Sequence, residues 1–197
     1  MNRRALTIRR KVYRDGHPLT LESLDNLASV LELQGSPAEA QALYRDYSQL
    51  LHDKLPVDDR ALAQVLSQLT HTLLVEGKSP EAEPTARESL RIYEKTLPDD
   101  WHTFFARSLL GDSLLGLNRY AEAEPLLLSG YEGMKQREDR IPTESKPRLK
   151  EALQRLARLY EGTGRPEQAA EFRKKLETFD KPQTATKAGA AASDPTK

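Results

Sequence analysis

One apolar pattern recurs four times along this chain. In each unit, leucines at helical spacing are followed by a glycine or asparagine and then by a small alanine. The four alanines are Ala40, Ala82, Ala123 and Ala169, which are 42, 41 and 46 residues apart. A period of this size is typical of a solenoid, in which each unit buries its apolar face only against its neighbours. The repeat therefore predicts an elongated array and favours binding over catalysis.

Each unit has the pattern of two antiparallel helices joined by a tight turn. The first helix ends at Gly35, Gly77, Asn118 or Gly164, residue types that tolerate the left-handed conformation after a helix. The second helix ends before Pro56, Pro98 or Pro142. The spacing predicts helix pairs at 18–34 with 37–54, 60–76 with 79–96, 101–117 with 120–138, and 147–162 with 166–178.

The array begins in mid-repeat. We expect residues 1–16 to hold a lone second-type helix over 3–14, residues 17–178 to form four helix pairs, and residues 179–197 to be a disordered tail. Either the chain is a fragment of a longer protein, or the lone helix caps the N-terminal end. Its apolar residues Leu6, Ile8, Val12 and Tyr13 would lack a covering helix, and such a stripe favours self-association.

Composition argues against several classes of protein. The net charge is zero and the sequence pI is about 6.9, so nothing favours a nucleic-acid partner. Residues 1–16 carry a net charge of +5 and residues 17–100 a net charge of −8. This uneven distribution either reflects solvated helix faces that happen to differ in charge or serves to steer a charged partner. The chain has no cysteine, no apolar run long enough to span a membrane and no secretory signal pattern. We expect a soluble cytoplasmic protein with no membrane partner.

Residues suited to catalysis or metal binding are scattered. The histidines are His17, His52, His71 and His102, and none forms a metal-binding pair at helical spacing. The sequence has no nucleophile elbow and no glycine cluster that could hold a phosphate. We therefore expect no catalytic, cofactor-binding or metal-binding residues, and no enzyme activity.

These units resemble tetratricopeptide repeats. Leu24, Leu27, Ala28, Leu31 and Ala40 follow the family pattern in order, and the other three units keep it with few departures. The unit length of about 42 residues resembles the kinesin-light-chain type of repeat. Residues 101–176 also resemble the repeats that end some bacterial serine/threonine protein kinases. The resemblance implies an all-α, right-handed superhelical solenoid of antiparallel helix pairs with a concave groove for a peptide or protein segment.

In this family the first helix of each unit lines the groove, and the resemblance selects ten positions expected to be exposed there. They are Asp25, Ser29, Gln64, Ser67, His71, Ser108, Asp112, Glu151, Gln154 and Arg158. Taken singly, each is an ordinary solvated helix position; taken as a surface, they are the candidate binding site. Some co-chaperone members bind a partner's C-terminal carboxylate with Lys and Asn at such positions. Here acidic and neutral residues stand there instead, which favours a basic or polar segment at the first units.

An aromatic cluster begins the third unit. Trp101, Phe104 and Phe105 could stack on a bound peptide, but packing between the second and third units is the favoured interpretation. Tyr44, Tyr47 and Tyr131 are likewise interpreted as packing between repeats.

The favoured function is a non-catalytic protein-protein interaction scaffold. The first alternative is a C-terminal regulatory or docking region of a larger bacterial signalling protein, such as a serine/threonine kinase. The second is a homo-oligomeric assembly module, for example a homodimer formed through the N-terminal helix.

Overall fold

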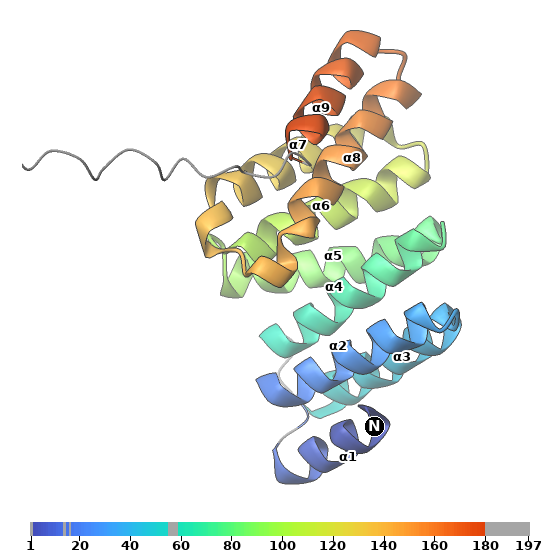
Figure 1. The fold of residues 1–197 in the computed structure, drawn as a ribbon, viewed down its shortest axis with the longest axis vertical. Coiled ribbons are helices and arrows are strands. Elements are labelled where there is room, and N and C mark those ends of the chain that lie inside the picture. The colour runs from blue at the N-terminus through green and yellow to red at the C-terminus, as the bar shows by residue number, and fades with distance from the viewer. Residues whose placement is uncertain (1, 14, 16, 55–58, 180–197) are drawn as a thin grey trace, which may run out of the picture.

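The computed structural model describes residues 2–13, 15, 17–54 and 59–179. Its α-helices are α1 (Asn2–Val12), α2 (Pro18–Leu33), α3 (Pro37–Lys54), α4 (Arg60–Val75), α5 (Ser79–Thr96), α6 (Trp101–Gly116), α7 (Tyr120–Gln136), α8 (Pro147–Gly162) and α9 (Pro166–Phe179). Two short 3₁₀ helices, Glu138–Arg140 and Thr143–Ser145, connect α7 to α8. The helices stack in chain order from α1 at one end to α9 at the other (Figure 1). The fold is the all-α solenoid of antiparallel helix pairs that the sequence predicts.

The helix ends lie within two residues of the predicted ones. Two helices, α1 and α7, end two residues earlier than predicted, and after α7 residues 138–140 tighten into a 3₁₀ turn. Phe179, which was assigned to the tail, is the last residue of α9. The rest of the expected tail, and the proline stop at residue 56, lie outside the described residues.

All four turns inside the helix pairs share one geometry. Gly35, Gly77, Asn118 and Gly164 have φ values of 74°, 70°, 59° and 68°, which confirms the predicted left-handed caps. After the first of these, Ser36 N–H donates to the Leu31 carbonyl at 2.8 Å, and Gly35 N–H donates to Glu32 at 3.0 Å. The same two bonds recur at the other turns, so the paired helices leave each turn in the same direction.

A polar contact recurs at successive joints between units, from the residue after a turn to the second helix of the preceding unit. Lys78 Nζ donates to Gln41 Oε1 at 3.0 Å, Arg119 Nη1 to Glu83 Oε1 at 2.7 Å, and Arg165 Nη1 to Glu124 Oε1 at 2.8 Å. These groups are partly exposed, so solvent screens each contact and its contribution to stability is small. Because the contact sits at an equivalent place each time, it helps to fix the register of neighbouring units.

The aromatic cluster is core, as predicted, but it packs in a different place. Trp101 and Phe105 belong to a small apolar cluster with Met134, Ile141 and Leu149, which joins the third pair to the fourth. Phe104 lies beneath two arginines, the nearer being Arg137 at 4.2 Å from the ring centroid. The prediction that these aromatics fill the joint between the second and third units was therefore wrong. The connection that carries Ile141 folds back over the start of α6 and supplies the partner.

In the third helix pair, α6 and α7 lie very close together at two glycines of α7. A Cβ added to Gly130 in α7 would lie 2.8 Å from the backbone nitrogen of Ser108 and 2.9 Å from the carbonyl oxygen of Phe104 in α6. Both neighbours are backbone atoms and cannot rotate away. Gly133, one turn later, faces the Phe104 ring in the same way. Glycine at these positions lets α6 and α7 touch.

This contact predicts the effect of a methyl group. Gly130→Ala should lower the free energy of unfolding by about 1–3 kcal/mol, because overpacking outweighs the gain of up to about 1 kcal/mol in helix propensity. Gly162→Ala is the matched control, since a Cβ there comes no closer than 3.6 Å to Tyr120. Urea denaturation followed by circular dichroism checks both. Equal stability of the two variants would contradict the close approach.

Candidate functional site

The first helices pack in order, α2 on α4, α4 on α6 and α6 on α8, and two cavities open beside this layer. The N-terminal cavity, of about 650 Å³, is bordered by α2, α4, the start of α6 and residues 142–151. The C-terminal cavity, of about 630 Å³, is bordered by α4, α6, α8 and α9. Glu151 lines both cavities, so they adjoin and form one hollowed surface.

Nine of the ten predicted groove residues line these cavities. The N-terminal cavity is bordered by Asp25, Ser29, Gln64, Ser67 and Glu151. The C-terminal cavity is bordered by His71, Asp112, Glu151, Gln154 and Arg158. Ser108 lines neither. The structure thus brings residues from four different units to one side of the solenoid.

Three of the ten residues are buried rather than exposed as we expected. Ser108 has no exposed surface, and Asp112 keeps 6% of its surface. Ser67 is also buried, with its hydroxyl 2.6 Å from that of Ser89 in the second helix of its own pair. Ser108 and Asp112 are covered by the next first helix, α8, through Arg155, whereas Ser67 faces α5 of its own pair.

Arg155 in α8 is the residue that the sequence analysis missed. It is only 5% exposed, and its guanidinium joins α8 to α6. Its Nε donates to Asp112 Oδ2 at 2.9 Å and its Nη1 donates to Ser108 Oγ at 3.1 Å, while its Nη2 reaches Glu151 Oε2 at 3.3 Å. Removing one partner of a buried pair is strongly destabilising. The repeat pattern does not single it out, because the equivalent residues of the first two units, Asn26 and Gln68, are polar as well.

The other oxygen of Asp112 faces the groove. Asp112 Oδ1 has no hydrogen-bond partner but lies 3.2 Å from Nη1 of Arg158, whose side chain is mostly exposed. One oxygen of the Asp112 carboxylate therefore fixes Arg155 at the floor of the C-terminal cavity. The other oxygen attracts the exposed guanidinium of Arg158 at the rim of that cavity.

A second charged cluster separates the two cavities. Arg148 Nη1 lies 2.6 Å from His71 Nε2 and 3.0 Å from Glu151 Oε1. The same nitrogen lies 3.2 Å from Glu151 Oε2. Because the guanidinium can only donate, the shorter contact with Arg148 favours an accepting Nε2 and a neutral ring. Burial, which outweighs the attraction of Glu151, lowers the pKa of His71. Burial alone would raise the pKa of Glu151, but its hydrogen-bonded and charged neighbours hold it at about 2. The neighbours that lower it are His71, 3.2 Å away, and the guanidinium groups of Arg148 and Arg155.

Asp25 has a different environment, made of neutral donors. Tyr44 donates its hydroxyl to Asp25 Oδ1 at 3.0 Å, and Gln64 donates its amide to Oδ2 at 3.2 Å. Burial raises the pKa of the Asp25 carboxyl, and these hydrogen bonds oppose the rise only in part. Asp25 is therefore an oriented carboxylate in the wall of the N-terminal cavity.

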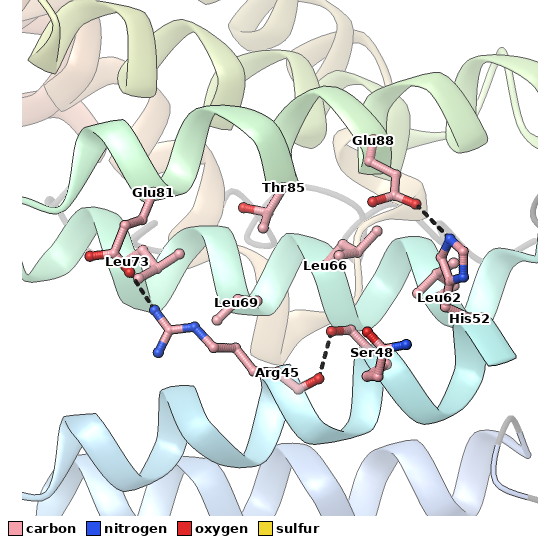
Figure 2. A pocket seen from close by; sticks show the side chains of 11 residues that line it. Arg45, Ser48, His52, Leu62, Leu66, Leu69, Leu73, Glu81, Thr85 and Glu88 are labelled. Atoms are coloured by element: carbon pink, nitrogen blue, oxygen red, sulfur yellow. Dashed lines mark hydrogen bonds and ion pairs between the residues drawn. The ribbon is translucent and has the colours of Figure 1, made fainter.

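A third hollow lies between α3 and α5, and the sequence analysis did not predict it. Its floor is a row of α4 leucines, and it encloses about 520 Å³ (Figure 2). Two contacts cross it: Arg45 Nη2 pairs with Glu81 Oε2 at 2.5 Å, and His52 Nε2 lies 3.9 Å from Glu88 Oε1. Because these contacts link α3 to α5 across the opening, we interpret this hollow as part of the packing between the first and second helix pairs.

Two kinds of feature are missing from residues 2–13, 15, 17–54 and 59–179. No three His, Asp or Glu side chains come together there in a way that could hold a metal ion. No helix in that part of the chain is long and apolar enough to cross a membrane.

Comparison with known families agrees with this geometry. Residues 1–51 match a family profile described as Tetratricopeptide repeat, and residues 105–128 match a second profile of the same description. Both matched segments therefore carry tetratricopeptide repeats, and the described residues form the helix-pair solenoid that such repeats build. Among proteins with curated descriptions, none matches its sequence closely enough to count as a relative.

Solved structures with this fold include kinesin-light-chain-like repeats. A Podosopora anserina protein described as a kinesin light chain with nearly identical TPR-like repeats has a TM-score of 0.65 at 20% identity, over 90% of this repeat protein and 82% of that chain. BtubC (BKLC) from P. vanneervenii has a TM-score of 0.58 at 14% identity, over 99% and 96%. MamA MSR-1 has a TM-score of 0.51 at 20% identity, over 91% and 87%. At these identities the likeness shows the fold alone.

The neutral state of His71 predicts a dependence of stability on pH. A group whose pKa is lowered by folding is protonated more readily in the unfolded chain, so stability falls as the pH drops below the unfolded value of about 6.5. The wild type should therefore lose stability between pH 7.5 and 5.5, and His71→Gln should flatten this slope. His52→Gln, at an exposed histidine, is the matched control. Thermal melts across this range test the effect, and parallel slopes for wild type and His71→Gln would contradict it.

Proposed function

We propose that this protein is a non-catalytic interaction scaffold that binds an extended or helical segment of a partner protein along the surface formed by its two cavities. The observation that carries the proposal is their adjacency, since Glu151 borders both and the lining comes from four units. A preformed surface of this kind binds through many modest contacts, with little cost of reorganisation. The absence of cysteine fits a cytoplasmic site of action. Within a larger signalling protein such as a kinase, the same surface would serve as a docking region.

Photo-cross-linking tests the proposal. A benzophenone side chain is introduced at Ser29 or Gln154, which are exposed and border the N-terminal and C-terminal cavities respectively. Matched controls carry it at Asp46 or Glu132, exposed positions on the second helices α3 and α7. We expect a cross-linked partner in lysate from the two cavity positions only, because the partner covers that side. Cross-links from the control positions alone would overturn the groove assignment.

A homo-oligomeric assembly is the second candidate, and one observation favours it. Ile8 in α1 is 51% exposed, whereas Ile92, at the equivalent place in α5, is 0% exposed. Val12 and Tyr13 are exposed beside it. The N-terminal end of the solenoid thus presents apolar surface that an additional helix would cover, and a second copy of the chain could supply it.

Sedimentation velocity at tens of micromolar tests the assembly. If α1 forms the interface, Ile8→Gln with Val12→Gln should convert an oligomer to monomer, because the covered apolar surface is lost. Leu33→Gln with Val75→Gln is the matched control, since these residues are at least as exposed but lie at the ends of α2 and α4. A wild-type monomer throughout this concentration range would remove the candidate.

A further inference from the structure

The N-terminal cavity holds more carboxylates than its cations pair. The carboxylates that border it are Glu22, Asp25, Glu144 and Glu151. Arg9 pairs with Glu22 at 3.2 Å, and Arg148 pairs with Glu151 at 3.0 Å. Within the part of the chain that the structure describes, Asp25 and Glu144 make no ion pair. Two negative charges therefore face this cavity without a cation of their own.

The cations that border the cavity are occupied elsewhere. Arg148 is held between His71 and Glu151, and its guanidinium lies 5.3 Å over the Phe105 ring. His102 lies against the carboxylate of Asp100, with its ring 3.8 Å from that of Trp101. Arg148 thus makes its hydrogen bonds to His71 and Glu151, and its charge offsets only part of the burial penalty on Asp25, so the Asp25 carboxylate is open to a cation supplied from outside.

Asp25 is also held in position for such a contact. Tyr44 and Gln64 orient its two oxygens without neutralising them. Burial raises the pKa of this carboxyl, which means that the surroundings disfavour its charge. An incoming cation would reverse that penalty. Trp101 and Phe105 border the same cavity and offer apolar wall to the stem of a long side chain.

We propose that the N-terminal cavity recognises a lysine or arginine side chain of the bound partner, with Asp25 accepting the hydrogen bonds of its charged group. Glu144, at the rim, adds negative potential that attracts the cation. The inference rests on the proposed function, because this cavity is one half of the same binding surface. It adds a specificity rule: the partner segment must present a basic residue at one defined place.

A phage-displayed random decapeptide library tests this rule. The library is selected against the wild type, against Asp25→Asn, and against Ser29→Trp with Gln154→Trp, which fills the mouths of both cavities. Asparagine keeps the shape of the aspartate and can still accept from Tyr44. Glu22→Gln is the matched control, since it removes one negative charge from the same cavity but from a carboxylate that Arg9 already pairs. Circular dichroism melts verify that each variant is folded.

Affinities are then measured by calorimetry for one selected peptide and for its counterpart in which norleucine replaces the basic residue. We expect the wild type to select peptides with Lys or Arg at one fixed position. Asp25→Asn should weaken the selected peptide about ten- to hundredfold and should bind the norleucine peptide as well as the wild type does. Glu22→Gln should change the affinity by less than about threefold, as for a partly screened exposed pair.

The remaining outcomes separate this inference from the proposed function. In one outcome, the wild type selects peptides that the double tryptophan variant cannot bind. If these peptides share no basic residue, or bind Asp25→Asn equally well, the assignment of the basic-residue pocket is wrong and the scaffold function stands. If every selected peptide also binds the double tryptophan variant, both the scaffold function and the basic-residue pocket are overturned.

Discussion

The close stacking of helix pairs is the constraint on which the rest of this structure depends. Ala40, Ala82, Ala123 and Ala169, one early in each second helix, are all almost completely buried. A single pair buries too little apolar surface to offset the entropy of ordering its chain. The pairs are stable only when stacked. The two cavities and the layer of first helices beside them follow from that stacking.

The fold could be predicted because its determinants are local. Leucine spacing gives the helices, and a glycine or asparagine marks each left-handed turn, as the positive φ values of Gly35, Gly77, Asn118 and Gly164 confirm. Nine of the ten expected groove positions also line the two cavities, while their role in binding stays a prediction. Helical periodicity fixes the side on which a residue lies, and that was enough to group them.

Burial at the site could not be predicted in the same way. Ser67, Ser108 and Asp112 occupy the predicted side but are covered by neighbouring helices. Arg155 is a charged residue that forms the floor of the site instead of its surface. Which side chain is covered depends on the distance and angle between successive units, and these are set by contacts between units such as that of Arg119 with Glu83. No single repeat encodes that geometry.

The shared border at Glu151 has a consequence for stoichiometry. A single partner chain could run across this carboxylate and occupy both cavities in one continuous path. Two separate ligands would meet there, and each would change the electrostatic environment felt by the other. The arrangement therefore favours one partner per protein molecule and makes separate short ligands thermodynamically coupled instead of independent.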